Sequence, residues 1–114
     1  MDLELENQSV AVFGGAGTIG QAVVKRFIEE GCQVLIFDAH PSTDEISKSM
    51  HENVLSIRSN VVDYEAVKTG LKDAANRFGR IDHVVFSVGA DSGKFSFHFW
   101  NLEPSDWSRI LEIN

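Results

Sequence analysis

Short apolar segments alternate along this chain with longer segments of helical periodicity, and this alternation restricts the possible folds more than any other feature. The apolar segments are almost without polar alternation and lie at 9–13, 33–37, 54–57 and 82–87. Strands of this kind are typically buried on both faces, as in a parallel sheet. Helices are expected at 18–30, 43–51, 63–78 and from Pro104 onward. Such strand–helix units predict a doubly wound α/β fold of the Rossmann type, with strand order 3-2-1-4.

Three of the expected helices carry apolar side chains at helical spacing. In the helix at 63–78 these are Val67, Leu71, Ala74, Ala75 and Phe78. In the first, the apolar face consists of Ile19, Ala22, Val23 and Phe27, and Gly31 is suited to end the helix. In the last, Trp107, Ile110, Leu111 and Asn114 fall at i, i+3, i+4 and i+7. This spacing places a polar Asn on the side expected to face inward, where it needs hydrogen-bond partners.

Composition argues against several classes of function. Seventeen acidic residues against ten Lys and Arg give a formal charge of −7, whereas nucleic acids and anionic membranes select clustered Lys and Arg. The longest uncharged run, 7–24, is interrupted by glycines and predicts strand, turn and helix rather than a membrane span. Cys32 is the single cysteine, and it shows no metal-ligand spacing with the histidines. We expect a cytoplasmic protein without metal, membrane or nucleic-acid partners.

A glycine-rich loop separates the first strand from the first helix. Residues 15–20 fit the pattern G-x-G-x-x-G, and Gly14 precedes them. Glycine lets the backbone turn tightly and approach a pyrophosphate, whose charge lies at the N–H groups of the helix N-terminus. The position between a strand and a helix indicates a dinucleotide site. Its candidate residues are Gly14, Gly15, Gly17, Thr18, Ile19 and Gly20. The alternative is a glycine turn that serves packing alone.

Asp38, at the end of the second strand, completes this pattern. Its carboxylate can accept hydrogen bonds from both hydroxyls of the adenosine ribose, and it repels a 2′-phosphate. The residues that follow, Ala39, His40 and Pro41, include no Arg or Lys. The sequence therefore favours NAD(H) over NADP(H), although Asp38 could also be a solvated loop residue.

From Phe13 to Gly20 the chain resembles the T-G-x-x-x-G-x-G loop of the short-chain dehydrogenase/reductase family. Phe13 replaces the usual Thr, and a glycine stands at position 17 rather than 18. The spacing G-x-x-G-x-x-G is closer to the extended, epimerase-like branch of the family. The resemblance covers almost the whole chain but only the N-terminal half of the family domain. It implies an NAD(P)-dependent oxidoreductase, with residues 1–114 forming an incomplete Rossmann domain.

The segment Asn60-Val61-Val62-Asp63 is similar to the family's D-V-x-D stretch after the third strand. The resemblance implies that Asn60 and the backbone of Val61 contact the adenine. Asn60 replaces the usual Asp, and its amide oxygen can still accept a hydrogen bond. Asn60 can also be a turn residue and Asp63 a helix cap, and both interpretations can hold together.

Residues 79–89 are similar to the family's G-x-I-D-x-x-V-N-N-A-G stretch, with Phe86-Ser87-Val88-Gly89 in place of N-N-A-G. The resemblance implies that Gly89 allows close approach of the cofactor and that Ser87 keeps one bracing hydrogen bond. A plain buried strand end is the alternative for this segment.

The segment 107–114 resembles the family helix that ends in a catalytic Asn, which makes Asn114 the candidate. In the family this Asn holds a water that relays protons to an active-site Lys. An Asn without a role, at the end of the chain, is the alternative.

The family's catalytic Y-x-x-x-K pair has no counterpart at the expected place. Tyr64 and Lys68 match the pattern literally, but they lie on the helix after the third strand, as i, i+4 neighbours on a solvated face. The aromatic stretch that includes Phe95, Phe97 and Trp100 can line a substrate pocket or cover the core.

Two hypotheses follow. The first is the cofactor half of a short-chain dehydrogenase/reductase, of the ordinary or the extended type. The resemblance implies that the complete enzyme acts on a small alcohol or carbonyl substrate and is a homo-oligomer. The second is a non-catalytic dinucleotide-binding module.

Overall fold

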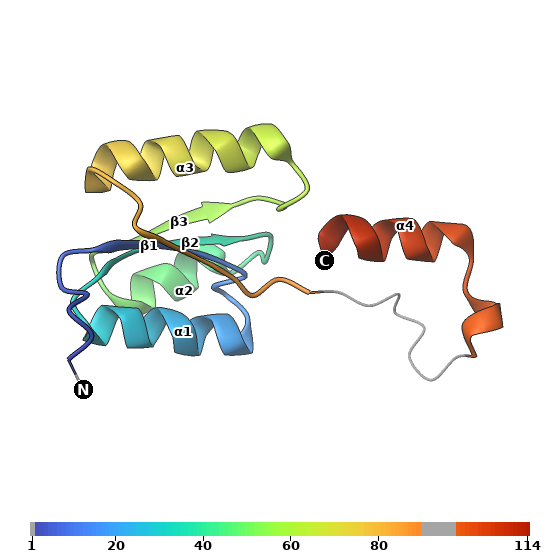
Figure 1. The fold of residues 1–114 in the computed structure, drawn as a ribbon, viewed down its shortest axis with the longest axis horizontal. Coiled ribbons are helices and arrows are strands. Elements are labelled where there is room, and N and C mark those ends of the chain that lie inside the picture. Colours follow the sequence, from blue (N-terminus) through green and yellow to red (C-terminus); the bar gives the residue numbers. More distant parts are fainter. Residues whose placement is uncertain (1, 90–97) are drawn as a thin grey trace.

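The computed structural model describes residues 2–89 and 98–114 and confirms the predicted parallel α/β architecture (Figure 1). The strands are β1 (Ser9–Phe13), β2 (Gln33–Asp38), β3 (Val54–Arg58) and β4 (His83–Phe86). The helices are α1 (Thr18–Glu29), α2 (Thr43–Met50), α3 (Tyr64–Phe78) and α4 (Pro104–Ile113), with a 3-10 turn at Phe99–Asn101. All strand pairs are parallel, and their order is β3-β2-β1-β4, as expected.

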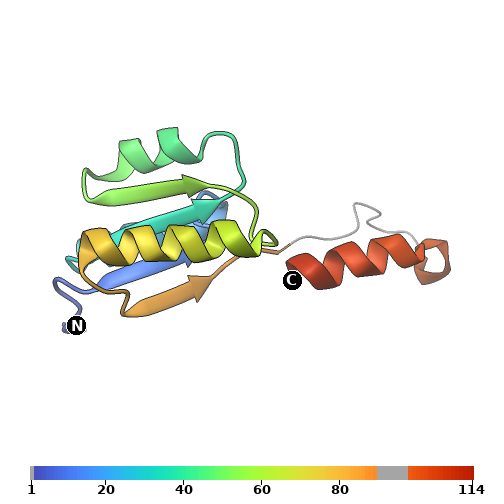
Figure 2. The ribbon, with the colours of Figure 1, turned by 90° about the horizontal axis from the view of Figure 1, so that it is seen from above.

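The sheet is covered by helices on both faces, and α4 lies apart from it. α1 and α2 pack on one face and α3 on the other, while α4 lies beyond the carboxyl ends of the strands (Figures 1 and 2). Its C-terminal end is directed back toward the sheet. Phe95 and Phe97 of the aromatic stretch lie outside the described residues.

The core is built on the two central strands. Every residue of β1 and Val34–Phe37 of β2 are buried, because helices cover both of their faces. Val10, Val12 and Val24 belong to the cluster under α1, and Phe37 and Ala74 belong to the cluster under α3. The expected double-sided burial therefore holds for the sheet centre.

The helix ends follow the sequence signals. Gly31 (φ +82°) and Gly79 (φ +88°) adopt the left-handed conformation after α1 and α3. Asp63 caps α3, because its side chain accepts a hydrogen bond from the Ala66 N–H at 3.0 Å. The cap interpretation of Asp63 is confirmed.

Asp82 connects the amino ends of the neighbouring strands β1 and β4. The Asp82 carboxylate accepts from the Ser9 N–H at 2.8 Å and forms an ion pair with Arg80. The hydrogen bond from the Ser9 N–H lowers the pKa of Asp82 below its ordinary value, and the adjacent Arg80 guanidinium lowers this pKa further.

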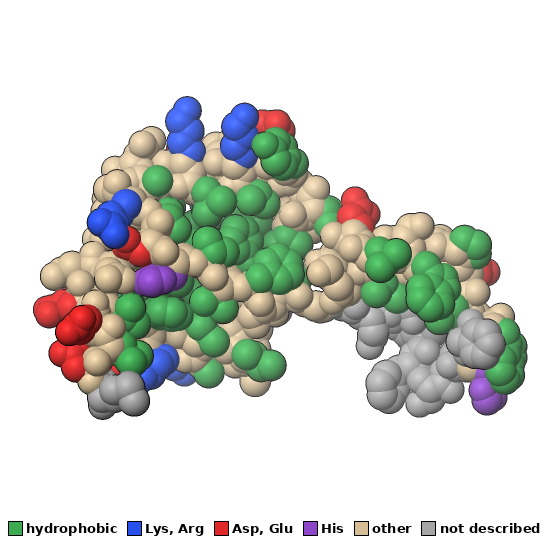
Figure 3. Space-filling model, in the orientation of Figure 1, with side chains coloured by type: hydrophobic (Ala, Val, Ile, Leu, Met, Phe, Trp, Pro, Cys, Tyr) green, Lys and Arg blue, Asp and Glu red, His purple; other side chains and the backbone are tan. Residues whose placement is uncertain are grey.

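The apolar faces of β4 and α4 differ from the expectation. Val84 and Phe86 are 60% and 53% exposed, because β4 is an edge strand that α3 does not cover. With Phe13, Val61 and Val67 they line an apolar hollow of about 210 Å³, here called the β4 patch (Figure 3). Expecting β4 to be buried on both faces was therefore wrong.

The apolar side of α4 does not pack inward either. Trp107 is 53% and Leu111 74% exposed, and no residue of α4 is buried. On α1, Ile19 is 73% exposed and Ala22 is exposed, whereas Gly20 and Val24 are buried. The predicted apolar face of α1 is therefore correct for Val23 and Phe27, which pack against the core, and wrong for Ile19 and Ala22.

Candidate dinucleotide-binding site

Three of the four loop glycines are required by packing alone. Gly14 has φ +82°, and a Cβ there would lie 2.8 Å from the Ser87 carbonyl carbon. A Cβ on Gly15 would lie 2.9 Å from Ile36 Cγ2, and one on Gly20 would lie 1.9 Å from the Gly14 oxygen. These contacts hold the loop tightly between β2, β4 and the first turn of α1.

Gly17 is different. Its φ is −76°, which any residue adopts, and it is exposed. The nearest atom to a Cβ there would be the Gly14 oxygen at 3.4 Å, an ordinary contact distance. The fold therefore leaves open space at Gly17, which suits the close approach of a ligand to the backbone.

The N-terminus of α1 is open to an anion. The N–H groups of Thr18, Ile19 and Gly20 have no acceptor among the described residues, since the first bond at this end runs from Gln21 to the Gly17 oxygen. Gly17 supplies no side-chain cap, and the first turn contains no acidic residue. The first turns of α2, α3 and α4 each contain at least one acidic residue. A negative group is therefore favoured in front of α1.

Asp38 lies directly beside this loop. Its Oδ2 accepts from the Ala16 N–H at 3.0 Å, and its Oδ1 accepts from the His40 N–H at 2.9 Å. The residue is half-buried. Each carboxylate oxygen has further lone pairs, so both remain able to accept from ribose hydroxyls.

A recess of about 180 Å³ continues from Asp38 along the carboxyl edge of the sheet. It brings together four residues predicted from the sequence: Asp38, Asn60, Val61 and Gly89. Ala39, Val88 and Ile113 also line it and were not predicted. Parallel strands end at one edge, so the residues that follow β2, β3 and β4 meet there. That rule could have identified Ala39 and Val88.

Asn60 and Ser87 make local backbone contacts. Asn60 Oδ1 accepts from the Val62 N–H at 3.1 Å, which confirms the turn interpretation. The Ser87 N–H donates to the Phe13 oxygen at 2.8 Å, and its carbonyl group packs against Gly14. Ser87 thus contributes through its backbone at the point where the loop meets β4.

Asn114 lies at the end of α4, beside Gly89. Its Nδ2 donates to the Ile110 oxygen at 2.9 Å, and its Oδ1 would lie 3.2 Å from a Cβ on Gly89. Asn114 is exposed rather than buried. Tyr64 is 72% exposed and Lys68 is also exposed, as expected for a solvated face of α3.

Arg58 is a cation that the local sequence around Asp38 did not reveal. It ends β3 and pairs in register with Asp38 on β2. Arg58 is exposed and forms no ion pair with Asp38 in the described part of the chain. Only the strand pairing brings it close.

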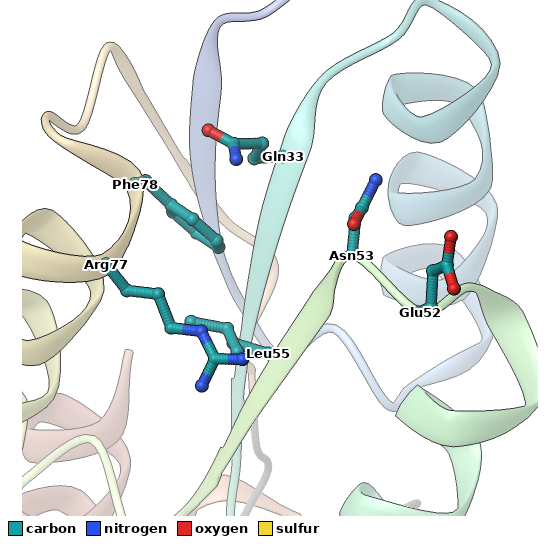
Figure 4. Close-up of a pocket in the computed structure, with 6 residues that line it drawn as sticks. All are labelled: Gln33, Glu52, Asn53, Leu55, Arg77 and Phe78. Atoms are coloured by element: carbon teal, nitrogen blue, oxygen red, sulfur yellow. The ribbon is translucent and has the colours of Figure 1, made fainter.

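A second recess lies at the opposite edge of the sheet and contains none of the predicted site residues. It measures about 140 Å³, and Figure 4 shows its lining from β2, β3, the turn before β3 and the C-terminal end of α3: Gln33, Glu52, Asn53, Leu55, Arg77 and Phe78. Within residues 2–89 and 98–114 no cluster of His, Cys, Asp and Glu could hold a metal. Over the same residues, no helix is long and apolar enough to cross a membrane.

Comparisons with known proteins identify relatives of this chain. Residues 8–114 match the family model described as short chain dehydrogenase. The ipsdienol dehydrogenase of Ips pini is 27% identical over 99% of this chain and 44% of its own length. The acetoacetyl-CoA reductase of a Synechocystis species is 29% identical over 100% of this chain and 44% of its own.

Solved structures show the same fold. The 3-ketoacyl-(acyl-carrier-protein) reductase from Brucella melitensis, crystallised with NADH, superposes with a TM-score of 0.84 at 20% identity. The alignment covers 96% of this chain and 44% of that one. The chain thus spans somewhat less than half the length of the relatives it matches. The family match over residues 8–114 establishes that the chain belongs to the short-chain dehydrogenase/reductase family.

Proposed function

We propose that this chain is the dinucleotide-binding half of an NAD(H)-dependent oxidoreductase, which transfers hydride between the nicotinamide and an alcohol or carbonyl substrate. The observation that carries the proposal is the open space at Gly17 in front of an uncapped helix N-terminus. Packing explains the other loop glycines, whereas a closely approaching phosphate explains this one.

Each predicted residue has a place in this proposal. Gly14, Gly15 and Gly20 shape the loop, and the N–H groups of Thr18, Ile19 and Gly20 hold the pyrophosphate. The exposed side chain of Ile19 is then covered by the bound dinucleotide.

In this proposal the recess beyond the loop receives the adenosine portion. Asp38 accepts from the ribose hydroxyls, and Asn60 and Val61 contact the adenine. Gly89 leaves room for the cofactor beside Asn114, and Ser87 holds the strand end against the loop. A bound nicotinamide supplies the hydride chemistry, and this chain supplies the surface that positions it.

The preference for NAD(H) rests on Asp38. Its carboxylate is held in place by two backbone N–H groups and repels a 2′-phosphate. Arg58, one strand away, weakens this repulsion but does not neutralise Asp38 by an ion pair among the described residues.

For the whole protein we propose a family oxidoreductase in which residues 1–114 are an incomplete domain. Asn114 would hold a water in its proton relay, and the acid–base pair would come from outside these residues. The β4 patch and the exposed side of α4 supply apolar surface for assembly into a homo-oligomer. The single buried Cys32 fits a cytoplasmic location.

Calorimetric titration of the purified protein with NADH and NADPH tests the proposal. We expect NADH to bind more tightly, and Asp38→Ala to narrow the difference by removing the repulsion. Equal or reversed affinities would disprove the NAD(H) preference. Absence of binding to both would disprove the dinucleotide site itself.

A further inference from the structure

We propose that Asp38 has a second task besides the ribose contact: its carboxylate braces the glycine loop and fixes where the loop directs its N–H groups. The inference rests on the proposed dinucleotide site and makes Asp38 a positioning residue for the pyrophosphate.

The two oxygens of Asp38 accept from two different loops. Oδ2 accepts from Ala16, in the loop after β1, at 3.0 Å. Oδ1 accepts from His40, in the loop after β2, at 2.9 Å. Both partners are backbone donors, so only an ionised carboxylate accepts fully from both. The side chain therefore connects the loops that follow neighbouring strands.

This brace extends the pairing of β1 and β2 beyond their ends. Phe13 and Phe37 form the last register pair, and the Gly14 N–H donates to the Phe37 oxygen at 2.8 Å. The Ala16 N–H, two residues further along the loop, lies beyond the last strand pair and donates to Asp38 instead. Ala16 is 7% exposed, so its N–H would be buried without an acceptor if the carboxylate were removed.

The exposed tip of the loop follows Ala16 directly. Gly17, Thr18 and Ile19 are exposed, whereas Gly14, Gly15 and Ala16 are buried. The Gly17 N–H turns back to the Gly14 oxygen at 3.1 Å, so fixing Ala16 also fixes this turn. The direction of the free N–H groups at the α1 N-terminus therefore depends on Asp38.

Charge and bracing predict effects of opposite sign. If Asp38 acts on the phosphates through its charge alone, its removal strengthens the binding of an anion at the loop. If Asp38 braces the loop, its removal weakens that binding. A probe that lacks the ribose contact separates the two effects.

The test compares wild type, Asp38→Ala and Asp38→Asn in binding an NADH analogue that lacks both hydroxyls of the adenosine ribose. We expect Asp38→Ala to bind the analogue at least fivefold more weakly and the Ala16 amide to exchange its hydrogen at least tenfold faster. Asp38→Asn keeps one acceptor oxygen and should give an intermediate affinity and an intermediate exchange rate. This variant keeps the test decisive if Asp38→Ala does not fold. Glu45→Ala, an exposed charge change on α2, is the matched control and should leave both readouts unchanged.

Analogue affinity that is unchanged or improved in Asp38→Ala, with unchanged exchange at Ala16, would overturn the brace. If wild type binds neither NADH nor the analogue, the proposed function fails. The exchange rate of the Ala16 amide then decides the brace by itself.

Discussion

Replacing Gly17 by Ala should abolish most dinucleotide binding while leaving the fold intact. The added methyl group would lie 3.4 Å from the Gly14 oxygen, its nearest protein neighbour, and the φ of −76° suits Ala. Ala is a poorer N-cap than Gly, which costs about 0.5–1 kcal/mol. Lower entropy of the unfolded chain offsets about 0.4–1 kcal/mol of this. The net change in unfolding free energy should be close to zero.

The same methyl group occupies the space in which a phosphate would contact the backbone. Inserting one extra carbon between the backbone and a closely packed phosphate should weaken the binding free energy by about 1–3 kcal/mol. This corresponds to a loss of about five- to 150-fold in NADH affinity. Calorimetry gives the affinity and a thermal melt gives the stability. The variant should melt within a few degrees of wild type.

Gly20→Ala is the contrasting variant in the same loop. Its Cβ would lie 1.9 Å from the Gly14 oxygen, so the loop must move and both stability and binding should fall. Wild-type affinity for NADH in Gly17→Ala would refute our explanation of the open space. A melting temperature lowered as far as that of Gly20→Ala would refute the assignment of Gly17 as structurally free.

Three further predictions follow from other parts of the chain. The 114 residues alone should not oxidise an alcohol with NAD, because they contain no correctly placed general acid. Tyr64→Phe should therefore leave the absent activity unchanged, and an activity that this substitution removes would contradict the prediction. The lowered pKa of Asp82 stabilises the fold above the unfolded value of about 3.9, and this stability is lost as pH falls through the folded pKa. Asp82→Asn should therefore lower the melting temperature at pH 7 more than at pH 3, whereas Asp73→Asn, an exposed control on α3, should not. The isolated chain should self-associate through the β4 patch, and sedimentation should show a larger monomeric fraction for Val84→Lys than for wild type. Leu3→Lys, a substitution at another exposed apolar residue, is the control and should sediment like wild type. A monomeric wild type would contradict the prediction.

The sequence predicted the architecture well because each element carries its own signal. The apolar segments, the glycines after α1 and α3, and the cap at Asp63 are local, and all are observed. The order of the strands followed from general rules for parallel sheets. The loop and Asp38 were predicted as a pair, and the structure places them in direct contact.

What the sequence did not predict depends on contacts between distant segments. Local apolar character could not show that Ile19 projects outward, away from the core. Arg58 is 20 positions from Asp38, and only their strand register reveals that they are neighbours. The brace from Asp38 to Ala16 likewise joins two loops whose geometry no local pattern encodes.

The contacts between the glycine loop, β4 and α4 have a consequence for tolerance to mutation. Gly20 presses on Gly14, Gly14 presses on the carbonyl of Ser87, and Gly89 faces Asn114. From Gly20 through Gly14 to Ser87, main-chain atoms meet residues without a side chain, so no rotamer change can absorb a misfit there, whereas Asn114 faces Gly89 through its side-chain Oδ1. A displacement at the start of α1 is therefore passed as a rigid shift of the main chain to Ser87, just after β4. Substitutions along this series should consequently alter how the proposed cofactor lies relative to Asn114, even where they touch neither.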